Sequence, residues 1–349
     1  MSTTFFLSAL LLVWSSWLLI FFQHTSFNYL LRQASRAAAV PAAVTTTIER
    51  PINIDSNAKR ALKTNSSLVI IMGNLRGGEQ AWHSLYRNVL DANSADLALI
   101  IGQRKRQNYG NPYPNSTLYT RAKYVWTFHE YDDWADAIDL VFNGTTTWRQ
   151  THLPYFTKKR AGLLGGVANH EGSGAIIFMI RWFLAQRLIT NPNILNQYER
   201  FVLTRADHYY QCQHSYQYLD LSNDTMWIPG QGENYGGFTD RHLIVSRNNI
   251  LDALDIFPTL FQQQVINNGT FQEWIAPGNP ESILKRVWMS KKLNVKRTER
   301  VMFTCATELD SSRWKRAKGD VPGIPGLLKK YESEYNETQL NCPPVSRLI

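Results

Sequence analysis

The sequence contains few cysteines and lacks the short motifs of several common enzyme classes. Its cysteines are Cys212, Cys305 and Cys342, which are too few for a disulfide scaffold and show no CxxC spacing for zinc. At most one disulfide can form, which leaves one thiol over. The chain also has no GxGxxG, GxxxxGKS/T or GxSxG motif. NAD enzymes, P-loop kinases and Ser-His-Asp hydrolases therefore lose support.

The composition favours a folded body that binds an anionic partner. Of the 349 residues, 44% are hydrophobic and 19% are charged, which is typical of a globular chain. The 37 Lys and Arg exceed the 28 Asp and Glu, and the formal net charge is +9. Such an excess favours nucleotides, phosphosugars, acidic glycans or lipid headgroups as partners. The 11 Trp, 16 Tyr and 16 Phe can supply both a core and surfaces that stack on a ligand ring.

The N-terminal segment predicts a membrane anchor. Residues 5–22, FFLSALLLVWSSWLLIFF, form an uncharged apolar run that is long enough to span a bilayer as a helix. The run is longer than the hydrophobic region of a usual signal peptide, and the nearest small-residue site, Ala37-x-Ala39, lies far beyond its end. We therefore expect an uncleaved signal-anchor helix that contacts the membrane through residues 5–22. A cleaved signal peptide is the alternative.

Two signals disagree about which side of the membrane carries the body. Arg32 and Arg36 follow the apolar run and no Lys or Arg precedes it, which alone favours a cytosolic body. Six N-glycosylation sequons indicate the opposite, and they begin at Asn65, Asn115, Asn143, Asn223, Asn268 and Asn336. Together the sequons outweigh two arginines. They predict a single-pass type II protein with a luminal body, for which nucleic acid is not an expected partner.

The chain beyond the anchor divides into a stem and a folded domain. The stem is rich in Ala, Thr and Pro. After it, strand-like apolar runs at 67–73, 95–101 and 124–128 alternate with helical patterns. This alternation predicts an α/β fold with a mostly parallel sheet flanked by helices. The parts we expect are a cytosolic tail (1–4), a signal-anchor transmembrane helix (5–22), a flexible stem (23–64), a catalytic-size domain (65–335) and a loosely ordered tail (336–349).

The first candidate site is a glycine-rich turn, Gly73-Asn-Leu-Arg-Gly-Gly, directly after the first predicted strand. Glycines allow backbone N–H groups to approach a phosphate, and the N-terminus of the following helix favours an anion. The guanidinium of Arg76 can bind a diphosphate through two N–H groups. We therefore predict phosphate binding by Gly73, Arg76 and Gly77. An ordinary strand-to-helix turn is the alternative.

The second candidate site, Thr204-Arg-Ala-Asp-His-Tyr-Tyr, follows a predicted strand at 201–204. Open α/β sheets bind ligands at the carboxyl ends of their strands. Asp207 is suited to hold Mn or Mg on a nucleotide diphosphate, because these ions prefer oxygen ligands. Arg205 is suited to neutralise a phosphate. The alternative is an Arg–Asp surface pair without a ligand.

The third candidate site is the loop over residues 227–242, WIPGQGENYGGFTDRH, where aromatic residues and glycines surround charged side chains. Aromatic faces stack on sugar rings and carboxylates bind hydroxyls. We predict that Glu233 or Asp240 removes a proton from an acceptor hydroxyl and that Arg241 orients the loop. A simple pair between Asp240 and Arg241 is the alternative. Glu281 is a weaker candidate, because Asn279, Pro280 and Glu281 already make a good helix start.

These segments together resemble a known group of transferases. The anchor, stem and sequons are similar to those of Golgi glycosyltransferases. The segments LTRADHYY, MWIPGQGENYGGFTDRHLIVSR and NPESILKRVW look like the R-x-D and GG-x-x-DR pattern of WavE-like glycosyltransferases, over about residues 65–305. The resemblance implies a GT-A-like, Rossmann-like fold in which Arg205-Ala-Asp207 stands where the metal-binding DxD lies. Arg205 departs from that pattern and puts metal dependence in doubt, since an Arg can neutralise a diphosphate itself.

Three functions are compatible with these features of the sequence. The first is transfer of a sugar from a nucleotide-sugar donor to a glycan or glycoprotein acceptor, with Arg76 and Arg205 on the diphosphate. The second is a Golgi sulfotransferase, although its phosphosulfate loop is expected to carry Lys with Ser or Thr, and the turn here offers only Arg76. The third is a membrane-tethered carbohydrate-binding glycoprotein without catalysis, which needs no Asp and Arg beside a phosphate-type turn.

Overall fold

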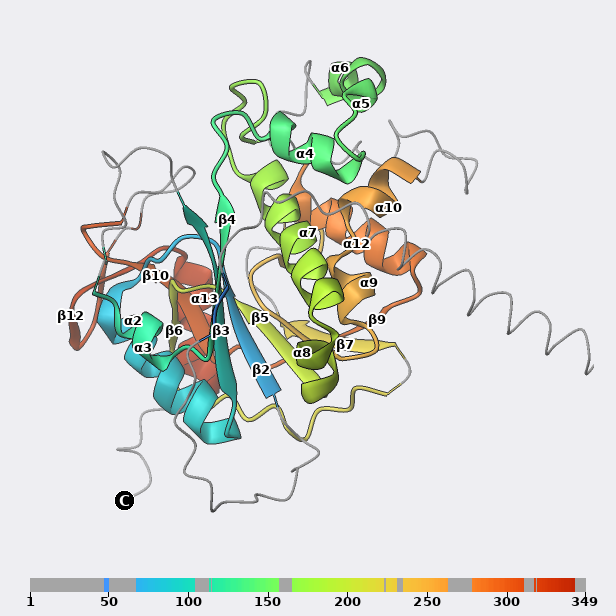
Figure 1. Cartoon of the computed structure of the whole chain (residues 1–349). Coiled ribbons are helices and arrows are strands. Elements are labelled where there is room, and N and C mark those ends of the chain that lie inside the picture. Colours follow the sequence, from blue (N-terminus) through green and yellow to red (C-terminus); the bar gives the residue numbers. More distant parts are fainter. Residues whose placement is uncertain are drawn as a thin grey trace, which may run out of the picture. The chain divides into compact units, whose positions relative to one another are not determined.

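The computed structural model describes an α/β body built from the part of the chain after residue 46 (Figure 1). The described residues are 47–49 (backbone only), 67–103, 113, 115–156, 165–222, 224–230, 235–262, 278–310, 317 and 319–342. The predicted cytosolic tail and signal anchor, and all of the predicted stem except 47–49, lie outside them. No helix within the described residues has the length and apolar character that a membrane span requires.

The main sheet contains eight strands in the order β1-β4-β3-β2-β5-β8-β7-β9. The strands are β1 Thr47–Glu49, β2 Ser67–Met72, β3 Asp96–Gln103, β4 Tyr124–His129, β5 Arg200–Thr204, β7 Thr225–Pro229, β8 Leu243–Ser246 and β9 Asn294–Thr298. Strands β4, β3, β2 and β5 are parallel neighbours, as are β7 and β9. Only β1 and β8 run against the others among the described strands. This confirms the predicted α/β class with a largely parallel sheet.

Helices cover both faces of this sheet. They are α2 Gly78–Leu85 continued by a π-helix at Tyr86–Asp91, α3 Thr117–Arg121, α4 Ala135–Val141, α5 Thr147–Thr151, α6 Leu153–Phe156, α7 Gly174–Thr190, α8 Pro192–Gln197, α9 Ile250–Leu254, α10 Phe257–Gln262, α12 Pro280–Ser290 and α13 Glu332–Asn341. The side chains of α4, α7, α9, α10 and α12 belong to one hydrophobic cluster, and those of α2 and α3 belong to a second. The central strands are therefore buried on both sides, which explains their unbroken apolar sequences.

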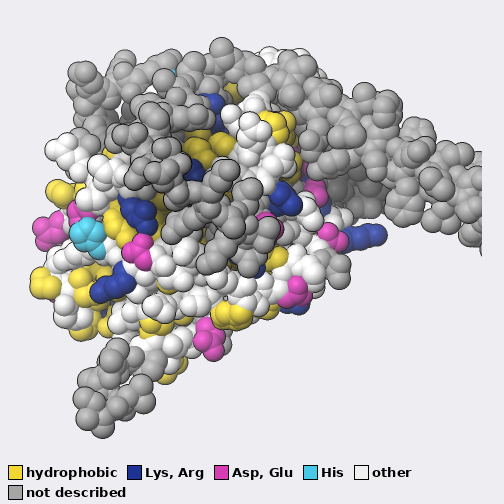
Figure 2. All heavy atoms as spheres, turned by 60° about the horizontal axis from the view of Figure 1, so that its bottom comes forward, with side chains coloured by type: hydrophobic (Ala, Val, Ile, Leu, Met, Phe, Trp, Pro, Cys, Tyr) yellow, Lys and Arg dark blue, Asp and Glu magenta, His cyan; other side chains and the backbone are white. Residues whose placement is uncertain are grey.

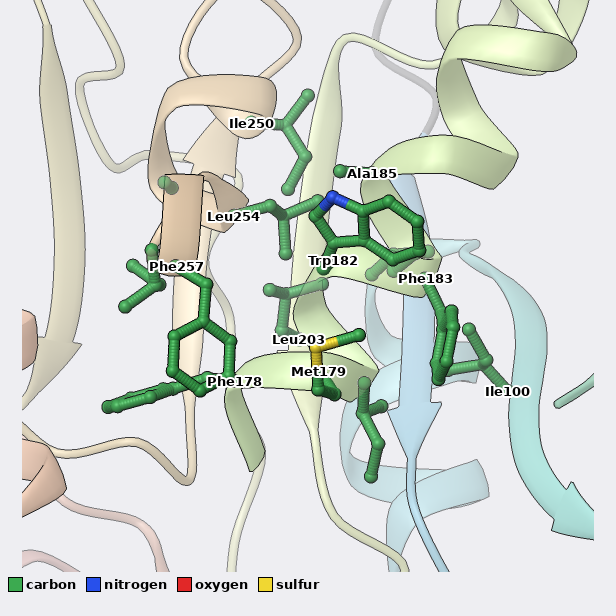
Figure 3. Close-up of a cluster of buried hydrophobic side chains, with 14 of the residues drawn as sticks. Ile100, Phe178, Met179, Trp182, Phe183, Ala185, Leu203, Ile250, Leu254 and Phe257 are labelled. Atoms are coloured by element: carbon green, nitrogen blue, oxygen red, sulfur yellow. The ribbon is translucent and has the colours of Figure 1, made fainter. Parts of the chain in front are cut away.

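Helix α7 forms the centre of the first cluster (Figure 3). Its sequence is apolar almost all round, as expected of a helix that packs between a sheet and further helices. Phe178, Met179 and Phe183 are each at most 1% exposed, and they lie near strand and helix side chains such as Leu203 and Leu254. Each such buried side chain contributes roughly 1.5–3 kcal/mol through removal of apolar surface from water.

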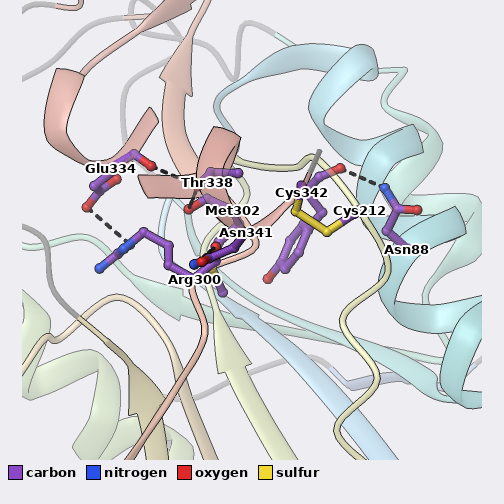
Figure 4. Close-up of a disulfide and its surroundings, with 9 residues drawn as sticks. Asn88, Cys212, Arg300, Met302, Glu334, Thr338, Asn341 and Cys342 are labelled. Carbon is purple, nitrogen blue, oxygen red and sulfur yellow. Dashed lines mark hydrogen bonds and ion pairs between the residues drawn. A yellow bond between two sulfur atoms is a disulfide. The ribbon is translucent and has the colours of Figure 1, made fainter. Parts of the chain in front are cut away.

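A second, four-stranded sheet joins the end of the chain to the middle. Its order is β11-β12-β10-β6, with β6 His208–Tyr210, β10 Met302–Ala306, β11 Asp320–Val321 and β12 Ile324–Lys329. Helix α13 follows, and Cys342 at its end forms a disulfide with Cys212 (Figure 4). The buried hydroxyl of Thr338 donates to the carbonyl of Met302 at 3.0 Å.

The ordered body thus extends to Cys342, beyond the predicted boundary at 335. The sequence missed this boundary because a disulfide holds the end of α13 to a residue 130 positions earlier. The sequence alone does not say which two of the three cysteines form that bond. Three sequon asparagines lie within the described residues, and the side chains of Asn115, Asn143 and Asn336 are exposed. Attachment of glycans at these positions stays a prediction.

Candidate functional site

The site lies where the order of the parallel strands reverses. The chain runs from β2 outward through β3 to β4, and then returns to place β5 on the other side of β2. In open α/β sheets, ligands bind beside the carboxyl ends of strands at such a switch point. Gly73 directly follows β2, and Arg205 directly follows β5. The first two candidate segments are therefore brought together, as their sequence positions predicted.

Two adjoining pockets open at this point. The β2–β5 pocket, of about 130 Å³, has an apolar wall from Phe128, Trp134 and Ile180 and a charged wall that includes Asp207. The α12 pocket, of about 250 Å³, is lined by Tyr235, Glu281, Lys330 and Tyr331 among others. The two share the side chains of Arg76, Ser173, Ile177, Arg205 and Asp240. Because the pockets share a wall, ligands in the two pockets would lie next to each other.

Arg205 and Asp207 form a two-pronged ion pair at the end of β5. Nε and Nη2 of Arg205 donate to the two carboxylate oxygens of Asp207 at 2.7 and 2.6 Å. The Asp207 side chain is 4% exposed and that of Arg205 is 27% exposed, so the cation faces the pocket more than the anion does. Burial alone would favour the protonated acid, but Arg205 holds the pKa of Asp207 well below its ordinary value.

This pairing bears on the metal predicted at Asp207. Both carboxylate oxygens already accept from Arg205, and a divalent ion would have to displace that guanidinium. Within the described residues, no group of three or more His, Cys, Asp or Glu side chains is arranged to bind a metal. These donors do not fit Mn or Mg as the sequence analysis placed them.

The glycine-rich turn has a different role from the one predicted for Gly77. The N–H of Gly77 donates to Oδ2 of Asp310 at 2.9 Å, so a carboxylate of the protein already occupies the start of α2. A Cβ on Gly77 would lie 2.9 Å from the Cα of Asp207, and its φ is +84°. Gly77 therefore allows the turn to pack against the end of β5, and does not present its N–H to a phosphate. Gly73 and Arg76 do line the β2–β5 pocket, and phosphate binding by them stays a prediction.

The third candidate segment contributes Tyr235, Asp240 and Arg241 to the lining of the pockets. Asp240 lines both pockets, while its backbone carbonyl accepts from Nη2 of Arg181 at 2.8 Å. Arg241 is 6% exposed and forms a buried ion pair with Glu334 of α13. Its position thus depends on a helix from the end of the chain, although its side chain also reaches the α12 pocket. Glu233 lies outside the described residues.

Glu281 belongs to the site although its sequence context suggested only a helix start. The predicted cap is present, since Oδ1 of Asn279 accepts from the N–H of Ser282 at 2.8 Å. Glu281 is 9% exposed and lines the α12 pocket together with Asp240. Burial and the negative charge of Asp240 raise the pKa of Glu281 to about 7. A carboxyl with a pKa near neutrality can accept and release a proton under physiological conditions.

Two cations of the site were missed in the sequence. Lys330 lies between β12 and α13, far from the other site segments, and nothing in its local sequence marks it. Arg181 is a charged residue within the otherwise apolar sequence of α7. It is 1% exposed, it lines the β2–β5 pocket, and its Nε has no hydrogen-bond partner within the described residues. A charge inside an otherwise apolar helix is the one signal that could have marked Arg181.

A cluster of three buried histidines lies behind the Arg205–Asp207 pair. His208, His214 and His242 are at most 5% exposed, and Nε2 of His214 lies 3.1 Å from Nε2 of His242. The hydroxyl of Thr204 bonds Nδ1 of His208 at 3.1 Å. Burial lowers the pKa of His208 and of His214 to about 4, and it lowers that of His242 well below its ordinary value. The three rings are therefore neutral at physiological pH and act as packing and hydrogen-bonding groups.

The outer surface shows no comparable concentration of charge on the face that Figure 2 presents. Basic and acidic side chains are interspersed there over the described residues. Comparison with protein-family models and with curated proteins gives no match for this chain. Its function must therefore be argued from the side chains that line the two pockets.

Proposed function

We propose that the chain is a GT-A-like glycosyltransferase that moves a sugar from a nucleotide-sugar donor to a glycan or glycoprotein acceptor. One observation carries the proposal: the carboxyl ends of β2 and β5 bring Arg76, Arg205 and Asp207 to one pocket at the switch point of the sheet. Cations at this position suit the diphosphate of the donor. The adjoining apolar wall of Phe128, Trp134 and Ile180 suits the flat face of a base or sugar.

The α12 pocket supplies the chemistry for the acceptor. In the ionised form, the carboxylate of Glu281 takes the proton of an acceptor hydroxyl while that oxygen bonds to the anomeric carbon of the donor sugar. The bond from the anomeric carbon to the diphosphate oxygen breaks, and its electron pair leaves with the diphosphate. Asp240 stays beside Glu281 and keeps its proton affinity high. Tyr235 and Tyr331 line the same pocket and can stack on the acceptor sugar.

The roles of Asp207 and Glu281 are tested by sugar transfer. The full chain in detergent is screened against nucleotide sugars by thermal shift and then assayed for transfer. Asp207→Asn should lower the rate by about 100-fold, as expected when a positioned electrostatic group is lost. Asp220→Asn removes an exposed carboxylate outside both pockets and should keep the wild-type rate. Because Glu281 must be ionised, the rate should rise with pH through about 7, and Glu281→Gln should remove that rise.

The same screen separates the alternatives. Stabilisation by a phosphosulfate donor and by no nucleotide sugar would favour the sulfotransferase. Binding of free sugars without any nucleotide would favour the tethered carbohydrate-binding protein. Full transfer activity in Asp207→Asn would remove the role proposed for that residue.

The proposed setting is the Golgi membrane, with residues 5–22 as a type II anchor and a luminal body. Protease added to intact microsomes should leave the body protected, and endoglycosidase should lower its mass. Digestion of the body in intact microsomes would reverse this topology.

A further inference from the structure

Among the described residues, five cations and four acids line the two pockets. The cations are Arg76, Arg181, Arg205, Arg241 and Lys330, and the acids are Glu130, Asp207, Asp240 and Glu281. Arg205 is paired with Asp207, and Arg241 with Glu334 of α13. Burial and the nearby Arg205 lower the pKa of Lys330 to about 8, and an anion beside Lys330 would favour its charged form.

Arg181 is the most unusual of these cations. A buried guanidinium is costly unless it is paired, and its Nε meets no acceptor within the described residues. Burial lowers the pKa of Arg181, and the negative charge of Asp240 opposes this effect. An anion in the β2–β5 pocket would compensate the charge of Arg181.

The start of α7 adds to this positive region. Ser173 precedes the helix and lines both pockets, but no side chain among the described residues caps the first turn, and this turn contains no acid. The N-terminus of a helix carries partial positive charge and N–H groups that can donate to an anion. This N-terminus is therefore suited to the same ligand as the side-chain cations.

We infer that the donor diphosphate is held without a divalent cation, by Arg76, Arg181, Arg205 and Lys330 at the start of α7. The inference rests on the proposed function, and it names the side chains that take the place of a divalent ion on the donor diphosphate. As the sugar leaves, negative charge grows on the departing diphosphate oxygen. Four cations fixed in place before the reaction stabilise that charge in the way a metal ion does.

The test is calorimetric binding of inorganic pyrophosphate and of UDP, GDP, CDP and ADP to the full chain in detergent. Each titration is run in EDTA and again with the ligand pre-equilibrated with Mn²⁺. We expect binding in EDTA, with an affinity that Mn²⁺ changes by less than about threefold. Arg181→Met and Lys330→Met should each weaken binding by about 10- to 100-fold, the range for a lost charged hydrogen bond. Lys296→Met is the control, because Lys296 lies in β9 and lines neither pocket.

Thermal stability distinguishes a ligand-binding role of Arg181 from a structural one. Replacement of a buried charge by an apolar side chain of similar size is often neutral or stabilising. Arg181→Met should therefore keep or raise the melting temperature while it loses affinity. Loss of stability with unchanged affinity would overturn the inference for Arg181.

Other outcomes separate the inference from the proposed function. Binding and transfer that appear only with Mn²⁺ would overturn the inference and leave the glycosyltransferase standing. Absence of binding by pyrophosphate and by every nucleotide, with and without Mn²⁺, would overturn both.

Discussion

The helices α2 and α7 both begin near the carboxyl ends of the central strands, but their N-termini are in different chemical states. At α2, the N–H of Gly77 is bonded to the carboxylate of Asp310. At α7, the described residues provide no side-chain cap and the first turn contains no acid, while Ser173 lines both pockets. The first N-terminus is neutralised by the protein itself, and the second is open to an anionic ligand.

This difference shows why a glycine-rich turn is a weak sign of a phosphate site. The turn before α2 has the glycines and the position that a phosphate would need, yet an acid 233 positions later satisfies it. The start of α7 has no recognised phosphate motif but faces the pocket. Whether a helix N-terminus binds a ligand thus depends on which donors the rest of the fold leaves open.

The largest expected effect comes from making α7 resemble α2. Ser173→Asp places a carboxylate at the cap position of α7, where it can accept from the first-turn N–H groups. We expect pyrophosphate to bind about 100-fold more weakly, because the new charge occupies the anion site, while the protein gains up to about 1 kcal/mol of stability. Calorimetry and thermal melting measure the two effects. Ser173→Asn provides a similar cap without charge and should bind within about threefold of wild type; equal losses in both variants would contradict the electrostatic explanation.

The second effect concerns the close approach of the α2 turn to the site. Gly77→Ala adds a Cβ that would lie 2.9 Å from the Cα of Asp207, at a φ of +84° that disfavours alanine. We expect a loss of roughly 2 kcal/mol in the free energy of unfolding, together with lower transfer activity. Denaturant titration measures the loss. Gly144→Ala is matched in positive φ but has open space around its Cβ, so a smaller loss is expected there.

A third, smaller effect is expected from removal of the cap of α2. Asp310→Ala leaves the N–H groups of Gly77 and Thr307 without their carboxylate acceptor. We expect a loss of about 1.5 kcal/mol in the free energy of unfolding, with unchanged affinity for pyrophosphate. The neighbouring exposed Leu309→Ala serves as the control in both measurements. A drop in affinity for Asp310→Ala alone would show that the two helix ends are not independent.

A further effect is a dependence of stability on acid, which involves neither helix end directly. Because burial lowers the pKa of His208 and of His214 to about 4, the unfolded chain binds more protons below pH 6.5 than the folded chain does. The contribution of the two neutral histidines to the free energy of unfolding is fully present above about pH 6.5. It is lost as the pH falls toward 4, by at most about 1.4 kcal/mol per histidine and pH unit. Thermal melting across this range should show the loss, and His214→Gln should reduce it.

Much of the fold could be predicted from local sequence because the central strands are buried on both faces. Residues 68–72 and 201–203 are apolar throughout, and α7 is largely apolar except at two arginines. The rule for open sheets then places Gly73 and Arg205 at one edge. Asp310, Lys330 and Glu334 could not be predicted in this way, because each acts on residues far from it in the sequence. Glu281 was undervalued because one position serves both a helix start and a pocket.

The disulfide between Cys212 and Cys342 has a consequence for the order in which the chain is made. It joins residues that are 130 positions apart, and it anchors the segment that carries Lys330, Tyr331 and Glu334. The ribosome delivers this segment after both central strands, so strands β2 and β5 can pair long before the pocket is complete. A nascent chain that stopped before residue 330 would contain both central strands and most of the core, but no finished site. Closure of the disulfide is then a covalent mark that the chain has been made as far as Cys342.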